Sequence, residues 1–440
     1  MSDARWRTYT AWVAAGLSAF VLAYVAYAHV LAASHRMSTD VRELREGFGN
    51  RDSLPPPWSV RTGASGGLTH AVRAGMLSIA GSGKTGEELL IASATRKFDD
   101  GVITLRFRVP GEAAVETFLG LEEAGTGRSV GAAFVAGATP FVRLYGDTSG
   151  PLRTVVASED ARVEAQPGEW HTLSLQFTPV YSMMTAFLDG RPLASTRMGW
   201  HQGTSGRIIF GARLRADVQN VAIEMESIAF DTIDWSATRS FDESFSGEFL
   251  DIRRWMFEFP NPDFGRLDAR IEKGHGLLVD GSLQSLTVEP AFMFLLRSAP
   301  FPLKSMHVEA ELWVDELEEA SLYFGLMGAS AWSAGDKVFD VGMAHRKGPV
   351  ETYVAGGWSG DGALRFDRGE PIVLPRKVSV AIVYDAASGL GRASIAGKTS
   401  ENHILDLKPL DVVALRLGAI AHAPGAKAKV HVRRVSVEMH

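Results

Sequence analysis

The sequence contains no cysteine, and this absence removes several classes of site at once. Disulfide bonds, thiolate metal ligands and thiol nucleophiles all require cysteine, so the chain uses none of them. The stability of the protein must therefore come from packed apolar cores. Its 440 residues are too many for one ordinary core and indicate two domains of about 200 residues each.

A strong excess of charge is also absent. The chain has 45 Lys and Arg against 51 Asp and Glu, a net charge of −6, and it contains no long basic block. Proteins that bind nucleic acid usually concentrate positive charge on one face, so this composition predicts no nucleic-acid partner. None of the 12 histidines stands in a His-Glu-x-x-His motif, and no such metal site is predicted.

A phosphate-binding loop is suggested by residues 80–88, AGSGKTGEE, but the match is incomplete. The P-loop motif is Gly-x-x-x-x-Gly-Lys-Ser/Thr, and its first glycine would fall on Ser78. Glu87 and Glu88 also place negative charge close to Lys84. We therefore predict a turn between two strands here, and no nucleotide.

Residues 11–33 form the one long apolar run, AWVAAGLSAFVLAYVAYAHVLAA, which carries no formal charge. Twenty-three helical residues are enough to cross a bilayer core of about 30 Å, so we predict a single transmembrane helix that follows a cytoplasmic tail of residues 1–10. A cleaved signal peptide, with its site at residues 26–28, is the alternative. The bulk of the chain is expected in the periplasm of a bacterium, or outside the cell, anchored to the inner membrane.

Four residues of this segment are candidate contact sites. Ala15, Ala19 and Ala23 recur every four residues, which gives either a smooth face for a neighbouring helix or a lipid-facing row of alanines. His29 is the one titratable residue inside the run and is a candidate ligand for a pigment or cofactor. No other cofactor is predicted.

Residues 34–57 are expected to form a stalk. Asp40 and Glu43 have the spacing of a helix N-cap with its partner, which predicts a short helix ending near Gly47. Pro55, Pro56 and Pro57 then predict a stiff, extended spacer.

From residue 58 onwards the apolar residues alternate, which is the pattern of β-strands buried on one face. Asp-Gly pairs such as 189–190 and 280–281 predict tight hairpin turns. The strand pattern of residues 103–109 recurs at 308–314, and that of residues 223–230 recurs at 430–437. In both members of the second pair the apolar residues are spaced by two, three and two positions. A three-residue step in an alternating strand predicts a β-bulge. We interpret the repeat as an internal duplication, with copies at 58–237 and 238–440.

Two motifs carry a family resemblance. Residues 168–177, GEWHTLSLQF, followed by 185–193, TAFLDGRPL, resemble a strand, hairpin and strand of concanavalin A-like lectin/glucanase domains, which include laminin G-like modules. Residues 241–247, FDESFSG, resemble the opening strand of the same superfamily. The resemblance implies an all-β fold with two tandem antiparallel β-sandwiches of jelly-roll type, behind the one transmembrane helix.

The resemblance also bears on chemistry. Glucanases of this superfamily carry Glu-x-Asp-x-x-Glu on one strand, because two carboxylates must flank the scissile bond. No Glu-x-Asp occurs in this chain, so we predict no catalytic residues and no enzyme. Lectin-like sandwiches often hold calcium, and a structural calcium ion at Asp263, Asp361 or Asp367 stays open, with ordinary turn residues as the other interpretation.

Trp200, Trp332 and Trp358 stand in loop-like sequence and are candidate contact residues for a sugar or a protein partner. The main hypothesis is a non-catalytic accessory subunit that stabilises a larger membrane complex, such as a photosynthetic reaction centre with its antenna or a respiratory complex. The alternative is a membrane-tethered carbohydrate-binding protein, and a divergent glycoside hydrolase is the third.

Overall fold

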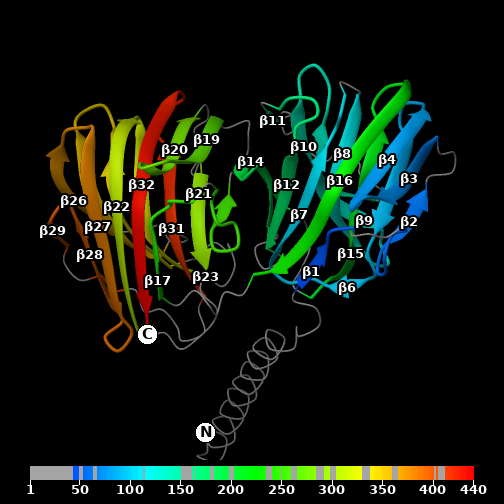
Figure 1. Cartoon of the computed structure of the whole chain (residues 1–440). Helices are drawn as coiled ribbons and strands as arrows, with labels where there is room; N and C mark the ends of the chain where they lie inside the picture. Colours follow the sequence, from blue (N-terminus) through cyan, green and yellow to red (C-terminus); the bar gives the residue numbers. More distant parts are fainter. Residues whose placement is uncertain are drawn as a thin grey trace, which may run out of the picture. The chain divides into compact units, whose positions relative to one another are not determined.

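The computed structural model describes residues 43–440 with several short gaps, and within them the chain consists of antiparallel strands joined by turns (Figure 1). The gaps in the described part are 49–52, 63–66, 112–113, 150–160, 164, 179–182, 198–202, 234–239, 248, 259–264, 284–291, 298–303, 330–336, 359–364, 401–402 and 405–411. Four antiparallel sheets, which we name A to D, account for the strands β1–β32. The all-β prediction is confirmed for the described residues.

Strands β1–β16 form sheets A and B. Sheet A contains β14 (Arg191–Arg197), β13 (Met183–Leu188), β12 (His171–Thr178), β7 (Gly101–Arg108), β16 (Val218–Thr232), β4 (Met76–Gly83) and β3 (Leu68–Arg73) in this order, with β1 (Glu43–Glu46) also on β16. Sheet B contains β11 (Ala161–Arg162), β10 (Phe141–Ser149), β9 (Arg128–Val135), β8 (Val115–Glu123), β15 (Ser205–Leu214), β5 (Glu88–Ala92) and β2 (Ser59–Thr62), with β6 (Arg96–Lys97) on β15.

Strands β17–β32 form sheets C and D. Sheet C contains β29 (Lys398–Thr399), β28 (Leu390–Ile395), β27 (Arg376–Asp385), β22 (Ser305–Glu318), β32 (Ala426–Met439), β20 (Gly276–Leu283) and β19 (Gly265–Glu272), with β17 (Ser240–Glu243) on β32 and β30 (His403–Ile404) on β28. Sheet D contains β26 (Arg365–Ile372), β25 (Val350–Trp358), β24 (Lys337–Ala344), β23 (Ala320–Ala329), β31 (Val412–Ala421), β21 (Phe292–Arg297) and β18 (Met256–Glu258).

The strand orders of the two halves correspond one to one. Sheet A follows the same order as sheet C, with β7 in the place of β22 and β16 in the place of β32. Sheet B follows sheet D in the same way, with β8 in the place of β23 and β15 in the place of β31. The sequence repeat of residues 103–109 and 308–314 lies on β7 and β22, and that of residues 223–230 and 430–437 lies on β16 and β32.

Each pair of sheets encloses one apolar core. The inward residues of β7 and β8, such as Leu105 and Leu119, are fully buried in the core of the first sandwich. Val308 on β22 and Leu326 on β23 are buried in the second in the same way. Because side chains alternate along a strand, the polar residues between them point away from the core.

The β-bulges predicted from the three-residue steps are present. The pairing of β16 with β7 shifts register between Met225 and Ser227. The pairing of β32 with β22 shifts between Arg434 and Val432. In both strands the extra residue keeps the apolar side chains on the core side of the sheet.

The Gly-Lys-Thr segment is a turn between two strands, as predicted, and it leads from β4 in sheet A to β5 in sheet B. Gly83 ends β4, Glu88 begins β5, and the amide of Glu87 donates to the carbonyl of Lys84 at 3.1 Å. Asp217 fixes the turn by accepting hydrogen bonds from the amide and the hydroxyl of Thr85, at 2.8 and 3.1 Å.

The short helix predicted between Asp40 and Gly47 is wrong over its described part. Glu43–Glu46 is strand β1, which pairs antiparallel with residues 228–231 of β16. Phe48 and Trp58 are buried in the first core, and Trp58 meets the ring of Phe210 edge-on at 5.1 Å. Tertiary pairing therefore overrides the local capping pattern, and part of the expected stalk belongs to the sandwich.

The predicted transmembrane helix at 11–33, with Ala15, Ala19, Ala23 and His29, lies outside the described residues. The part of the chain that the structure describes contains no helix with the length and hydropathy of a membrane span.

Candidate ligand-binding site

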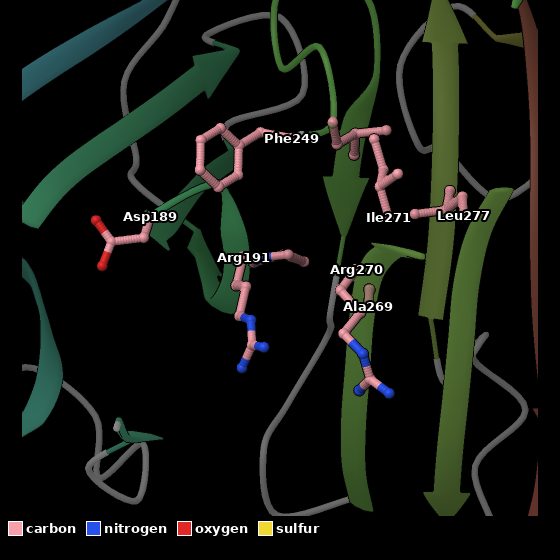
Figure 2. A pocket seen from close by; sticks show the side chains of 10 residues that line it. Asp189, Arg191, Phe249, Ala269, Arg270, Ile271 and Leu277 are labelled. Carbon is pink, nitrogen blue, oxygen red and sulfur yellow. The ribbon is translucent and has the colours of Figure 1, made fainter. Parts of the chain in front are cut away.

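A pocket of about 150 Å³ lies between the β13–β14 hairpin and the start of the second sandwich (Figure 2). The hairpin contributes the turn residues 189–190 and the beginning of β14. The other wall comes from residues 249–250 and from β19 and β20. The lining residues are Asp189, Gly190, Arg191, Pro192, Phe249, Leu250, Ala269, Arg270, Ile271 and Leu277.

Phe249 is the most unusual member of this lining. Its side chain is 51% exposed, whereas most phenylalanines of the described chain are buried. The ring lies directly against Gly190, because a Cβ atom on that glycine would come within 2.6 Å of it. Gly190 also has a φ of +73°, so two independent reasons favour glycine at this position. The result is an aromatic face that is open to solvent at the mouth of a pocket.

Asp189 is held in place by the start of β12. One carboxylate oxygen accepts from the amide of Thr172 at 2.7 Å, and the other lies 2.8 Å from Nδ1 of His171. This hydrogen bond raises the pKa of His171 above its ordinary value, although burial of the ring acts in the opposite direction. The His-Thr and Leu-Asp-Gly motifs that carry the family resemblance therefore meet in space and lock the hairpin at the pocket.

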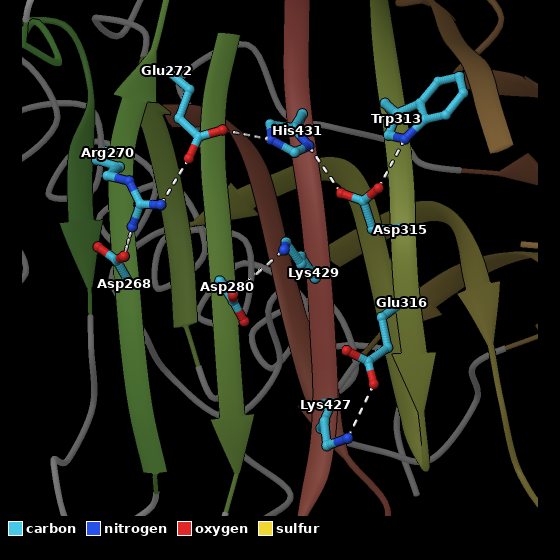
Figure 3. A network of polar contacts seen from close by, with 10 residues as sticks. All are labelled: Asp268, Arg270, Glu272, Asp280, Trp313, Asp315, Glu316, Lys427, Lys429 and His431. Carbon is cyan, nitrogen blue, oxygen red and sulfur yellow. Dashed lines mark hydrogen bonds and ion pairs between the residues drawn. The ribbon is translucent and has the colours of Figure 1, made fainter. Parts of the chain in front are cut away.

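Arg270 connects the pocket to a polar network on the outer face of sheet C (Figure 3). Its guanidinium donates to Glu272 at 2.7 Å and also pairs with Asp268. Arg191, from the hairpin, is exposed on the other wall. The pocket thus has one arginine that is fixed by carboxylates and one that extends into solvent.

The network continues through His431 on β32. Nε2 of its ring lies 3.0 Å from Glu272, and Nδ1 lies 3.0 Å from Asp315. Trp313 donates from Nε1 to the other oxygen of Asp315 at 2.9 Å. The hydrogen bond from His431 is the main reason why the pKa of Glu272 lies below its ordinary value. Glu272 is therefore a carboxylate at neutral pH and holds Arg270 in position.

A second polar cluster lies on the outer face of sheet D. Asp340 on β24 is 9% exposed and accepts two hydrogen bonds from Arg416, at 3.0 and 2.5 Å. The guanidinium carbon of Arg416 lies 4.8 Å from the centre of the Tyr323 ring. Burial raises the pKa of the Asp340 carboxyl, and the charge and hydrogen bonds of Arg416 act in the opposite direction.

Most of the predicted contact and calcium residues lie outside the described part of the chain. Trp200 and Trp332 lie outside the described residues, and Trp358 is the last residue of β25, with no description of its side chain. Asp263 and Asp361 also lie outside them, whereas Asp367 sits within β26 opposite Val354 instead of in a loop. Among the described residues no group of three or more His, Asp or Glu side chains has the arrangement of a metal site.

No protein-family model matches this sequence. No curated protein matches it either. Solved structures do match. They include a laminarinase from Flavobacterium sp. UMI-01, with 13% identity and a TM-score of 0.34, and a Bacillus licheniformis β-glucanase, with 12% identity and a TM-score of 0.32. They cover 43% and 44% of this chain, and 99% and 100% of their own chains. The Crh5 transglycosylase has 14% identity and a TM-score of 0.34, over 44% of this chain and 85% of its own.

The described strands form antiparallel sheets that pack as β-sandwiches, which is the coarse fold that the sequence motifs predicted. At 11–15% identity the likeness concerns the fold and does not carry over any reaction or substrate.

Two predictions are corrected by the same comparisons. The similar concanavalin A-like structures are glucanases and a transglycosylase, which contradicts a non-catalytic accessory subunit of a photosynthetic or respiratory complex. They contradict in the same way the prediction that the chain is no enzyme. That prediction relied on the absence of one motif, and a missing motif does not exclude carboxylates that come together from different strands.

The sequence motifs did not single out Phe249, Arg191 or Arg270. Phe249 stands in Ser-Gly-Glu-Phe-Leu-Asp, just after the opening motif of the second copy, where it looks like one more core residue. The Asp-Gly pair at 189–190 was the available signal, since it marks a hairpin tip. Only the contact of that tip with residue 249 identifies the pocket.

Proposed function

We propose that this protein binds a glycan, and that the pocket beside Phe249 holds one sugar residue of it. The observation that carries the proposal is the exposed ring of Phe249 at the mouth of a pocket with charged side chains on both walls. A solvent-exposed aromatic face costs free energy unless a ligand covers it, and the C–H face of a sugar ring fits such a surface.

The polar lining suits hydroxyl groups. Asp189 accepts hydrogen bonds, and Arg191 and Arg270 donate them in a planar fork. Pockets for drug-sized ligands measure roughly 300–1,000 Å³, so a volume of about 150 Å³ suits a single ring of a longer chain.

The similar structures favour a particular first probe. Two of them are named as a laminarinase and a β-glucanase, so laminari-oligosaccharides and mixed-linkage β-glucan oligosaccharides are the ligands to test first. Their names motivate this choice of probe and do not establish the substrate of this chain.

We further propose that the chain is a tandem duplication of the jelly roll with copies near 58–237 and 238–440, since the strand orders of its halves correspond. Residues 11–33 would anchor it to the bacterial inner membrane with the sandwiches in the periplasm. Three more features stay proposals. They are a neighbouring transmembrane helix that packs against Ala15, Ala19 and Ala23, a bound calcium ion, and partner contacts through the loop tryptophans.

The test is titration calorimetry of the full chain in detergent with a panel of oligosaccharides. We expect binding to at least one of them, and Phe249→Ala should weaken it roughly tenfold because the stacking surface is lost. Val383→Ala is the matched control, since Val383 is also an exposed apolar residue, on β27. A blank panel, or equal binding by Phe249→Ala and the original protein, would overturn the proposal. Chromatography of the same mixtures measures whether the glycan is cleaved.

A further inference from the structure

The histidine at position 431, on β32, has a carboxylate against each of its two ring nitrogens (Figure 3). Nε2 makes a hydrogen bond of 3.0 Å with Glu272 at the end of β19, and Nδ1 lies 3.0 Å from Oδ2 of Asp315 on β22. The His431 side chain is only 12% exposed. Oδ2 of Asp315 is itself buried and accepts no hydrogen bond of normal geometry from the described residues, so the imidazole ring is the partner that the structure gives it.

This arrangement requires a proton on both nitrogens of the ring. Neutral imidazole carries one N–H group, and its other nitrogen presents a lone pair. In either tautomer of His431 that lone pair would lie 3.0 Å from a carboxylate oxygen. The imidazolium instead offers a donor to each carboxylate and a positive charge between them. The geometry therefore fits the charged ring and not the neutral one.

The cations beside His431 on β32 are occupied elsewhere. The ammonium of Lys429 lies 4.0 Å from Asp280 on β20, and the guanidinium of Arg433 lies over the Trp313 ring at 5.2 Å from its centre. Within the described part of the chain, neither cation forms an ion pair with the two carboxylates that face the imidazole. From β22, the indole N–H of Trp313 is neutral and reaches only the other oxygen of Asp315. The charge between the carboxylates must therefore come from the ring.

The contact ties the edge of sheet C to its interior. β19 is the edge strand, and β20 separates it from β32, with the apolar Leu278 opposite His431. The imidazole reaches past β20 to Glu272, the last residue of β19 before the turn. Arg270, which donates to Glu272 at 2.7 Å, lines the pocket beside Phe249. The ring thus holds one wall of that pocket through Glu272.

We propose that His431 is a positioning residue of the pocket that acts only when it is protonated. The imidazolium holds Glu272 and the β19–β20 hairpin against β32. Loss of its proton, which for imidazole falls between about pH 5 and 8, releases the hairpin and with it Arg270. Weaker ligand binding at the higher pH is a consequence that rests on the proposed function, whereas the release of the hairpin does not.

Hydrogen exchange of the full chain in detergent, followed by mass spectrometry, tests the release of the hairpin. Peptides from residues 265–283 are compared between the original protein and His431→Gln at about pH 5.5 and about pH 8.5. At the lower pH we expect the original protein to exchange roughly tenfold more slowly in this segment. At the higher pH the two proteins should exchange alike. Comparison at one pH removes the intrinsic dependence of exchange on pH.

His275 provides the matched control. It is an exposed histidine in the same turn, its ring centre lies 5.8 Å from that of His431, and no ion pair of His275 is found among the described residues. His275→Gln should therefore exchange like the original protein at both pH values. If His431→Gln does not fold, Glu272→Gln takes its place, because the amide removes a carboxylate that requires the second proton.

Two results of the exchange experiment would overturn the proposal. One is a difference between His431→Gln and the original protein that has the same size at both pH values, which would indicate a merely structural role. The other is an equal effect of His275→Gln, which would show that the position between the carboxylates is not what matters.

Titration with laminarihexaose at the same two pH values separates this proposal from the proposed function. His171, beside the opposite wall, also titrates, so affinities are compared between proteins at one pH. We expect His431→Gln to bind roughly fivefold more weakly than the original protein at the lower pH and equally well at the higher pH. Equal affinities at the lower pH, together with faster exchange of the hairpin, would overturn the link between His431 and the pocket. Absence of all binding counts against the proposed function, and the exchange result then decides the role of His431 by itself.

Discussion

Single residues fix the polar cluster on sheet D, and Gly325 shows how. A Cβ atom at this position would lie 2.0 Å from Oδ1 of Asp340 and 2.7 Å from the carbonyl of Phe339. The absence of a side chain on β23 is therefore what lets the Asp340 carboxylate lie across the strand toward Arg416.

Gly325→Ala is expected to destabilise the protein by about 1–3 kcal/mol, because the added methyl group must displace Asp340 or the neighbouring backbone. Chemical denaturation measures this loss. Gly348→Ala is the matched control, since its nearest contact would be at an ordinary 3.7 Å. Equal stability of the two variants would show that Asp340 has room to move.

His171 is a single residue that makes a pH-dependent contribution to the free energy of unfolding. Its folded pKa is raised above the ordinary value by Asp189, so its stabilising effect is fully present below the unfolded pKa and is lost as the pH rises through the folded pKa. The free energy of unfolding of the original protein should therefore exceed that of His171→Gln by more at pH 5 than at pH 9. A difference that is the same at both pH values would contradict the role given to Asp189.

At the scale of elements, side chains fix the turns between strands, and the turn from β4 in sheet A to β5 in sheet B is one example. This Gly-Lys-Thr turn is fixed by Asp217 at the start of β16, through two hydrogen bonds to Thr85. The turn is followed by strand β5 and not by a helix that could hold a phosphate, so the glycines serve the backbone of a turn between the two sheets.

Asp217→Ala should cost about 0.5–1.5 kcal/mol of stability, the usual net value of hydrogen bonds in an exposed turn. Thermal unfolding measures it, with Asp99→Ala as the control because no ion pair of Asp99 is found in the described structure. Addition of Mg-ATP should leave the melting temperature of the original protein unchanged. A rise with ATP would restore the nucleotide interpretation.

At the scale of the whole described chain, the segment before β18 connects the two sandwiches. The side-chain amide of Gln176, on β12, donates to the carbonyls of Ile252 at 2.6 Å and Trp255 at 2.7 Å. Arg253 pairs with Asp231 at 2.5 Å. Phe187, from β13, packs into the apolar cluster of the second sandwich.

Because of these contacts, the two sandwiches should unfold together. Gln176→Ala leaves two backbone carbonyls without their donor, and we expect a loss of about 1–3 kcal/mol and a broader or divided calorimetric transition. Gln166→Ala, at an exposed position, is the control. Two separate transitions in the original protein would contradict the coupling.

The sequence by itself determined the strand pattern and the two bulges, because alternation of apolar residues and its three-residue steps are local properties that every core-facing strand must satisfy. The sequence did not predict the segments whose structure depends on which strands pair with them. Glu43–Glu46 is a strand because β16 offers it a free edge, and Asp280-Gly281 lies inside β20 instead of at a turn because Asp280 pairs with Asp268 across the sheet. Only the tertiary structure brought Phe249 against Gly190 and the arginines of sheet B around Glu116, since these contacts join residues that are 27 to 99 positions apart in the chain and leave no local pattern.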